Sequence, residues 1–100
     1  MQPRDRTILD VVRSLREGDV ASYGDIADDA GYPKLSRLVG RLLSENEDPD
    51  VPWWRVVNSV GRLVPGHETE QAARLRSEGV TVRDGRVVGT NAGRFRRRDR

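Results

Sequence analysis

Pro52-Trp53-Trp54-Arg55-Val56-Val57 is the stretch from which the rest of this chain can be interpreted. It holds both tryptophans of the protein, side by side, between a proline and an Arg-Val-Val run. The simplest explanation of such a pair is a hydrophobic core, and we expect this explanation to hold for at least part of Trp54. The valine pair favours a short strand over residues 55–57.

The sequence before this stretch predicts three helices. Apolar residues at helical spacing indicate the first over residues 5–16, with Gly18 beyond its end. Ser22 followed by Asp25 has the spacing of a capping box, so a second helix should begin there and end at Gly31. Pro33 favours the start of a third helix over residues 33–45. Two helices joined by such a short turn are typical of a helix-turn-helix.

The exposed side of this third helix is predicted to carry two parallel rows of side chains. Lys34, Arg37 and Arg41 form a basic row. Ser36, Gly40 and Ser44 recur every four residues beside it, and small residues allow a helix to approach a nucleic-acid groove closely. An ordinary solvated helix face would show the same pattern, so the pattern by itself leaves both explanations open.

The sequence after the tryptophans predicts small β elements and one more helix. Residues 46–51 form an acidic loop that cannot continue the helix, and strands at 55–57 and 62–64 should flank a turn at 58–61 as a small wing. A fourth helix is expected over residues 68–78, with Ala72 and Leu75 inward and Gly79 at its end. Asp84-Gly85 predicts a tight hairpin between 81–83 and 86–88. The expected fold is therefore mainly α with small β hairpins, a winged helix-turn-helix domain over residues 1–90.

Composition narrows the classes of function. The 100 residues are 35% hydrophobic and 34% charged, which suits one small domain with a modest core. No apolar run approaches the roughly 20 residues that span a membrane, and we see no basic-then-apolar leader. We therefore expect a cytoplasmic protein, nucleoid-associated if bacterial. The chain has no cysteine and a single histidine, His67, so we expect no disulfide, no metal and no cofactor.

The charge is unevenly distributed along the chain. Residues 91–100 carry five arginines against one aspartate, whereas residues 1–90 carry 13 basic and 15 acidic residues. The predicted domain is therefore not globally basic, and any contact with nucleic acid must come from a local basic row or from the tail. The polar, arginine-rich tail is expected to be disordered when free.

Three blocks of this sequence, in the right order, resemble the DNA alkyltransferases that repair alkylguanine. Residues 22–27, Ser-Tyr-Gly-Asp-Ile-Ala, resemble the first block, and residues 31–40 resemble the recognition helix. Residues 52–57 resemble the active-site motif Pro-Cys-His-Arg-Val-Val, with Trp53 in place of the acceptor cysteine and Trp54 in place of the histidine. Replacement of the cysteine by tryptophan is typical of the alkyltransferase-like proteins. The resemblance covers about residues 5–82.

The resemblance implies specific roles in DNA binding. The family binds the minor groove through its helix-turn-helix and rotates the damaged nucleotide into a pocket beside the motif. By that likeness Arg37 fills the space left in the duplex, Tyr23 crowds the neighbouring phosphate, Asn46 orders the pocket loop, and Glu78 matches the carboxylate that orients the histidine. The implied DNA-binding residues are Tyr23, Lys34, Ser36, Arg37, Gly40 and Arg41, and the implied lesion-pocket residues are Tyr23, Asn46, Pro52, Trp53, Trp54, Arg55, Val56 and Glu78.

The departures from the family pattern argue against catalysis. Alkyl transfer in this family needs a thiolate, and an indole nitrogen is a donor without useful nucleophilicity. Trp54 also removes the general base, so we predict that the protein is not an enzyme. Relatives often place a basic residue against the base near residues 62–67, for which both Arg62 and His67 are candidates.

Two functions follow as hypotheses. The first is a monomeric sensor of O6-alkylguanine in double-stranded DNA that flips the lesion and flags it for nucleotide excision repair, a partner implied by the resemblance alone. The alternative is a winged-helix transcription regulator or protein-interaction module, which would bind without preference for a modified base.

Overall fold

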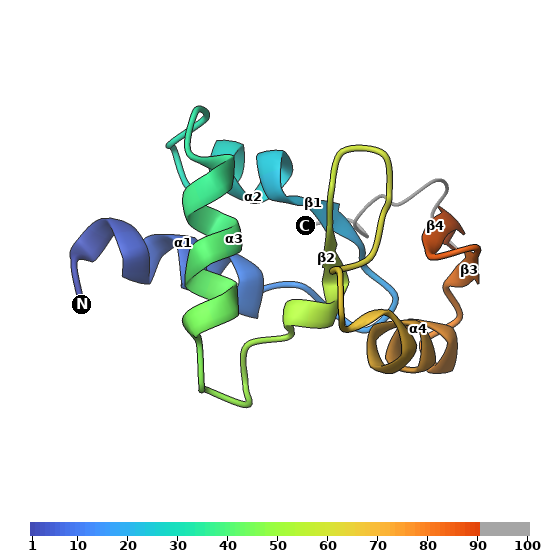
Figure 1. The fold of residues 1–100 in the computed structure, drawn as a ribbon. Helices are drawn as coiled ribbons and strands as arrows, with labels where there is room; N and C mark the ends of the chain where they lie inside the picture. The colour runs from blue at the N-terminus through green and yellow to red at the C-terminus, as the bar shows by residue number, and fades with distance from the viewer. Residues whose placement is uncertain (91–100) are drawn as a thin grey trace.

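A computed structural model describes residues 1–90, and the predicted basic tail at 91–100 lies outside the described residues. The described elements follow in the order α1 (Pro3–Arg13), β1 (Ala21–Ser22), α2 (Tyr23–Asp29), α3 (Ser36–Glu45), η1 (Trp53–Arg55), β2 (Val56–Val57), α4 (Glu68–Ser77), β3 (Thr81–Arg83) and β4 (Arg86–Gly89). The helices α1, α2 and α3 gather on one side of β1 and β2, and α4 with the β3–β4 hairpin lies on the other (Figure 1). The predicted mainly helical fold with small β elements is confirmed.

The helix-turn-helix forms from α2 and α3, and its first cap is the one predicted. The Ser22 hydroxyl accepts a hydrogen bond from the Asp25 backbone N–H at 3.0 Å, and the Asp25 carboxylate accepts one from the Ser22 N–H at 3.0 Å. Gly31 ends the helix with φ of +89°, a conformation that favours glycine. This turn delivers the chain into α3, which packs against α2.

Two predicted helix boundaries are wrong. The third helix begins at Ser36 rather than Pro33, because the Leu35 N–H donates to the Tyr32 carbonyl at 3.0 Å and residues 33–34 occupy the middle of that turn. Lys34 therefore lies just before α3 instead of on it. The first helix spans Pro3–Arg13 rather than 5–16, because proline is preorganised for the first helical position.

The predicted pairing of residues 55–57 with 62–64 is also wrong. The strand β2 pairs in parallel with β1, with Ala21 opposite Val56 and Ser22 opposite Val57. The Asn58 side-chain oxygen accepts hydrogen bonds from the Val60 and Arg62 N–H groups at 3.0 and 2.8 Å. The Gly61 N–H donates to the Asn58 carbonyl at 2.9 Å, so the predicted turn at 58–61 is present although the strand pairing is not. Arg62 instead forms a bridge with Arg86 of the β3–β4 hairpin.

The short β1–β2 pair divides the interior into two apolar clusters. Successive strand residues point to opposite faces. Ala21 and Val56 accordingly join the cluster of α1, α2 and α3, whereas Val20 and Val57 join the cluster under α4 and the hairpin. Leu75 of α4 is fully buried in the second cluster, as predicted.

The β3–β4 hairpin confirms its predicted turn. Asp84 and Gly85 both have positive φ, at 53° and 72°, which is the requirement of a two-residue type I′ turn. The Leu63 N–H donates to the Gly85 carbonyl at 3.0 Å, so the hairpin also receives the segment that follows the Asn58 turn.

A buried glutamine on α4 fixes the backbone around the tryptophans. Gln71 has no exposed surface. Its amide nitrogen donates to the Trp54 and Val56 carbonyls at 3.1 Å each, and its oxygen accepts from the Val64 N–H at 2.7 Å. One side chain therefore satisfies three backbone groups that no strand pairs, and the sequence pattern did not predict this role.

Replacement of Gln71 by leucine, which has a similar volume, should destabilise the fold. Each buried backbone group left without a partner costs roughly 1–3 kcal/mol, so we expect a total loss on the order of 2–4 kcal/mol. Urea unfolding at neutral pH measures the loss, with Thr69→Ala on the exposed side of α4 as a control that should change stability by less than about 0.5 kcal/mol. Equal stability of Gln71→Leu and the unaltered protein would contradict this role.

Candidate nucleic-acid interface

The basic row beside α3 is exposed and uncompensated. Lys34, Arg37 and Arg41 are all exposed. None of the three forms an ion pair with another residue in the range 1–90. Their charges are therefore available to an external anion, and a helix that presents free arginines fits a phosphate backbone.

Of the predicted small-residue row, Gly40 lies against Tyr23, whereas Ser36 and Ser44 are exposed. A Cβ atom built on Gly40 would lie 3.8 Å from Cε1 of Tyr23, so Gly40 is in contact range of the tyrosine ring as well as beside the arginines. The Ser44 hydroxyl donates to the Arg41 carbonyl at 2.8 Å, within the same helix. Of the predicted small residues, Ser36 is exposed at the start of α3.

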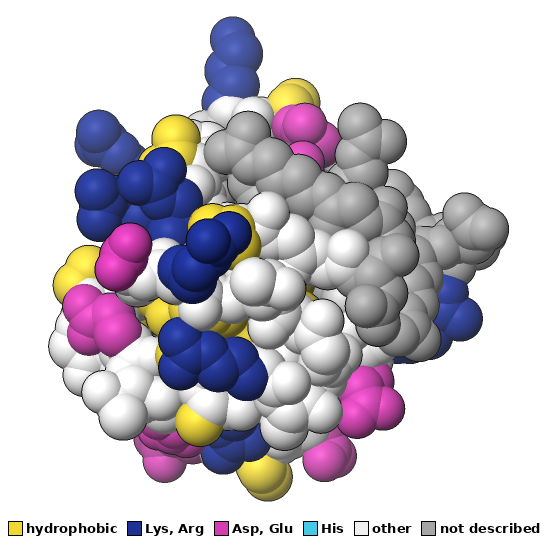
Figure 2. Space-filling model, turned by 90° about the vertical axis from the view of Figure 1, so that its right-hand side faces the viewer, with side chains coloured by type: hydrophobic (Ala, Val, Ile, Leu, Met, Phe, Trp, Pro, Cys, Tyr) yellow, Lys and Arg dark blue, Asp and Glu magenta, His cyan; other side chains and the backbone are white. Residues whose placement is uncertain are grey.

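The side of the molecule with α4 and the hairpin has a different charge pattern. Figure 2 shows this side, where side chains of both signs are present on the part that is not grey, Lys and Arg mainly toward the upper left and centre and Asp and Glu mainly toward the left edge and the lower right. Charges of both signs that lie close together cancel at a distance. The basic row at α3 is therefore the stronger candidate for contact with nucleic acid.

A pocket lies between the end of α3 and the start of α4. Its volume is about 310 Å³. It is lined by Tyr23, Gly40, Leu43, Ser44, Asn46, Trp53, Val64, His67 and Glu70. The pocket shares Gly40 with the α3 surface, so a group bound in it would lie next to whatever the basic row contacts.

Trp53 supplies the aromatic wall of the pocket. It is half-buried and belongs to the 3-10 turn η1. Its ring meets the Trp54 ring edge to face, with centroids 6.3 Å apart, and the His67 ring at 5.9 Å in a similar arrangement. These two contacts hold the indole in one orientation, which is the requirement of a preformed stacking surface.

Tyr23 and Asn46 also line the pocket. Burial raises the pKa of the Tyr23 phenol, so its hydroxyl stays protonated and can donate a hydrogen bond. The Asn46 amide donates to the Asp48 carbonyl at 3.0 Å and closes the loop that follows α3. Both residues line the pocket, where the resemblance placed them.

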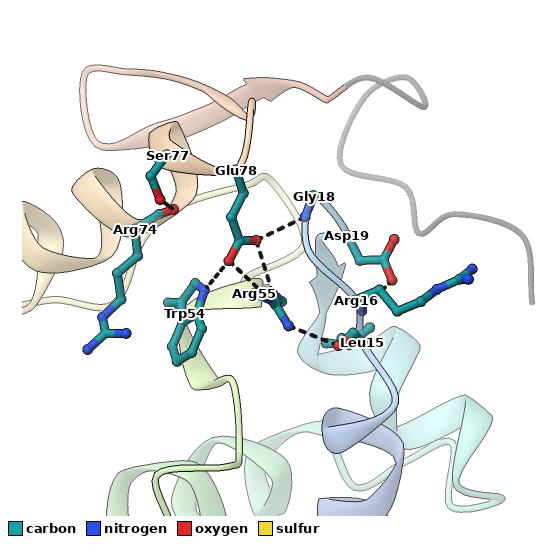
Figure 3. Close-up of polar contacts among 9 residues, drawn as sticks. All are labelled: Leu15, Arg16, Gly18, Asp19, Trp54, Arg55, Arg74, Ser77 and Glu78. Atoms are coloured by element: carbon teal, nitrogen blue, oxygen red, sulfur yellow. Dashed lines mark hydrogen bonds and ion pairs between the residues drawn. The ribbon is translucent and has the colours of Figure 1, made fainter.

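The remaining residues implied for the pocket do not line it. Pro52 and Val56 are buried, and Trp54 packs against the cluster under α4, as its expected core role requires. Trp54, Arg55 and Glu78 meet at the end of α4 (Figure 3). None of them lines the pocket, and we refer to the three together as the group behind the pocket. They support the turn that carries Trp53 rather than form its binding surface.

Glu78 organises this group behind the pocket. Its carboxylate accepts hydrogen bonds from the Trp54 indole N–H at 2.9 Å, from the Gly18 N–H at 2.9 Å, and from the Arg55 guanidinium at 3.0 and 2.8 Å (Figure 3). Arg55 also donates to the Leu15 carbonyl at 3.0 Å. The side chains of Arg55 and Glu78 are 15% and 8% exposed, so this is a largely buried ion pair whose hydrogen bonds are satisfied.

The environment of Glu78 keeps it ionised. Burial by itself would raise the pKa of Glu78, but hydrogen bonds from Arg55, from the Gly18 N–H and from Trp54 outweigh burial and lower it. A carboxylate whose acceptors are all engaged by such donors serves structure and has no proton to exchange near neutral pH.

Six of the nine lining residues were not assigned to the pocket from the sequence: Gly40, Leu43, Ser44, Val64, His67 and Glu70. Glu70 carried no signal because the spacing of α4 identifies only its inward face, and Val64 was assigned to a strand of the predicted wing. His67 was one of two candidates for a residue against the base, and the structure places it in the lining. The other candidate, Arg62, is exposed and is not among the lining residues.

Neither metal binding nor membrane insertion is indicated by the described part of the chain. No group of three His, Asp or Glu side chains within residues 1–90 could hold a metal ion. Likewise, no helix in that range has the length and apolar character to cross a membrane.

Comparison with known proteins gives one consistent result. Residues 3–80 match the family model described as 6-O-methylguanine DNA methyltransferase, DNA binding domain. The chain is 38% identical over 78 residues to a DNA base-flipping protein of Vibrio parahaemolyticus, covering 75% of this chain and 78% of that protein. It is 35% identical over 80 residues to alkyltransferase-like protein 1 of Schizosaccharomyces pombe, covering 75% and 74%.

Longer proteins and solved structures agree with this match. A bifunctional methyltransferase/endonuclease of Thermoplasma volcanium is 36% identical over 94 residues, but this chain spans only 29% of its length. The crystal structure of S. pombe Atl1 in complex with DNA containing O6-carboxymethylguanine superposes with a TM-score of 0.76 at 31% identity, covering 94% of this chain and 87% of that one. The winged-helix-like fold expected from the sequence is thereby confirmed.

The ion pair behind the pocket should make stability depend on pH. Glu78→Gln removes the negative charge that pairs with the Arg55 guanidinium. Breaking a buried ion pair in this way lowers the free energy of unfolding by roughly 3–5 kcal/mol. Because the folded-state pKa of Glu78 is lowered from 4.5, the unaltered protein has this stabilisation above pH 4.5 and loses it as the pH falls below that value.

Urea unfolding at neutral pH and at a series of pH values below 4.5 measures this effect. The difference between the unaltered protein and Glu78→Gln should shrink on acidification. The control Glu17→Gln changes an exposed carboxylate and should leave stability nearly unchanged. A difference that stays constant with pH would contradict an ionised Glu78.

Proposed function

The chain belongs to the family of the 6-O-methylguanine DNA methyltransferase DNA-binding domain, and on that premise we propose that it binds O6-alkylguanine in double-stranded DNA without chemistry. The observation that carries the proposal is the pocket with Trp53 as its wall, beside an uncompensated basic row. The position of the family's acceptor cysteine is Trp53, and the chain has no cysteine at all. The protein therefore recognises the lesion and does not repair it.

The pocket suits an extrahelical base. Its volume of about 310 Å³ lies at the lower end of the range of small-ligand pockets. Stacking of a base on an aromatic ring contributes about 1–3 kcal/mol, which offsets part of the few kcal/mol needed to unstack and unpair a nucleotide. The indole of Trp53 is already fixed by Trp54 and His67, so little further ordering is needed on binding.

The surface beside the pocket suits the duplex from which the base leaves. Arg37 is exposed on α3, within one helical turn of Gly40, which lines the pocket. We propose that the Arg37 side chain occupies the space that the flipped nucleotide leaves in the duplex. Lys34 and Arg41 would then contact the flanking phosphates along the minor groove. Tyr23 has a protonated hydroxyl at the pocket rim, where it can meet the phosphate of the rotated nucleotide.

Because the chain has no thiol to accept the alkyl group, the bound lesion must be removed by another protein. A protein without a thiol acceptor cannot remove the alkyl group, so another activity must excise the damaged nucleotide. We propose that the monomeric protein presents the flipped lesion to nucleotide excision repair. This proposal is supported by the absence of cysteine from the chain, which leaves no acceptor for the alkyl group.

A gel-shift comparison tests the function directly. Two duplexes identical except for one guanine or one O6-methylguanine are titrated with the protein at the same salt concentration. Tighter binding to the modified duplex supports the proposal. Equal binding to both, with preference among unmodified sequences instead, would favour a winged-helix regulator.

Trp53→Ala should selectively weaken binding to damaged DNA. Loss of one base-stacking ring should remove about 1–3 kcal/mol of affinity for the O6-methylguanine duplex and little for the unmodified one. Fluorescence anisotropy with both duplexes measures the two affinities. If both fall equally, Trp53 maintains the fold rather than binding the base, a conclusion that urea unfolding of the same variant would check.

Arg37→Ala should distinguish a space-filling arginine from a phosphate contact. A residue that stabilises the vacated duplex matters when the lesion must be unpaired, but not when it is already single-stranded. We therefore expect a greater loss of affinity for a modified duplex than for a single strand with the same lesion. Arg83→Ala, an exposed arginine on β3, is the matched control and should affect both little. Equal losses for duplex and single strand would make Arg37 a phosphate contact.

A further inference from the structure

The wall of the pocket contributed by α4 carries a negative charge. Among the described lining residues Glu70 is the one acidic side chain, and neither lysine nor arginine is present. The other polar lining groups are the side chains of Tyr23, Ser44, Asn46 and His67. The pocket therefore presents a carboxylate to whatever enters it, without a cation in the same wall.

The charge of Glu70 is only partly compensated. Arg74, one turn further along α4, donates from Nε to Oε2 of Glu70 at 3.1 Å. The Arg74 guanidinium lies 4.5 Å from the centre of the Trp54 ring, behind the pocket, and Arg74 is not a lining residue. The side chains of Arg74 and Glu70 are 46% and 55% exposed, and an exposed ion pair of this kind is weak.

We propose that Glu70 determines which alkyl adducts the pocket accepts, favouring neutral and cationic O6 substituents over anionic ones. The inference rests on the proposed function, because it assumes that the alkylated base enters this pocket. An anionic substituent would meet the Glu70 carboxylate and be repelled by its like charge. A neutral substituent of the same shape meets no such repulsion, and a cationic one is attracted.

The test uses pairs of adducts that differ in charge but not in shape. The full chain is titrated by fluorescence anisotropy against duplexes with one O6-carboxymethylguanine, which is anionic, or one O6-carbamoylmethylguanine, its neutral isostere. We expect the neutral adduct to bind about three- to tenfold tighter, a range set by a weak, partly screened charge interaction. The ratio should shrink at high salt, because the site is open to solvent.

Substitution of the carboxylate links the ratio to Glu70. In Glu70→Gln the ratio should fall toward one, since the amide keeps the shape and loses the charge. Glu68→Gln removes the same charge two residues earlier on α4, outside the lining, and should keep the ratio of the unaltered protein. A ratio that is equal in the unaltered protein and Glu70→Gln, or a preference for the anionic adduct, would overturn the inference.

A third pair of duplexes separates this inference from the proposed function. Unmodified guanine and O6-methylguanine differ in no charge, so Glu70 does not affect that comparison. Preference for O6-methylguanine without charge discrimination would overturn the role of Glu70 alone. No preference for O6-methylguanine would overturn both proposals.

Discussion

The ion pair between Arg55 and Glu78 joins three segments that are distant in the sequence. Glu78 lies at the end of α4, Arg55 ends the turn η1, and the backbone at Leu15 and Gly18 follows α1. Because the pair is largely buried, loss of either partner leaves a charge in an apolar setting, and the three segments must stay together.

The position of Trp53 depends on this ion pair, because Trp53 belongs to the same turn η1 as Arg55. Successive residues of a 3-10 turn point about 120° apart, so fixing Trp54 against Glu78 directs Trp53 the other way, toward the pocket.

The same cluster explains how a catalytic arrangement can become a scaffold. By resemblance, the family uses the carboxylate to orient a histidine that activates a thiol. Here the carboxylate at Glu78 is retained, but it receives an indole N–H and a guanidinium, neither of which is a base. The carboxylate oxygens of Glu78 therefore accept hydrogen bonds that stabilise the fold. The indole that replaces the histidine keeps a hydrogen bond to the carboxylate while adding apolar surface to the cluster under α4.

Much of the fold could be predicted because its signals are local. The capping box at Ser22 and Asp25 and the Asp84-Gly85 turn each depend on residues close in sequence, and both are confirmed. The pairing of β2 with β1 depends on a contact about 35 residues away and left no periodic pattern, so a wing was predicted in its place.

For the pocket, Tyr23, Asn46 and Trp53 could be placed from sequence motifs. Glu70 and Gln71 could not, because their roles depend on where α4 docks rather than on their spacing along it.

The two-residue pairing of β1 with β2 has a consequence for how the chain acquires its structure. The strand β2 contributes Val56 to one apolar cluster and Val57 to the other, and Ala21 of β1 and the preceding Val20 do the same. Neither cluster is therefore complete until residues 20–22 and 56–57 have met. A nascent chain that has emerged from the ribosome only as far as α3 lacks Val51 and Val56, and its three helices have an unfinished interior. The helix-turn-helix should therefore not mature ahead of the segment that carries the tryptophans. The surface of α3 that we propose to contact DNA and the pocket wall should become ordered in the same cooperative step, so partly made chains should not bind DNA through a folded α3 alone.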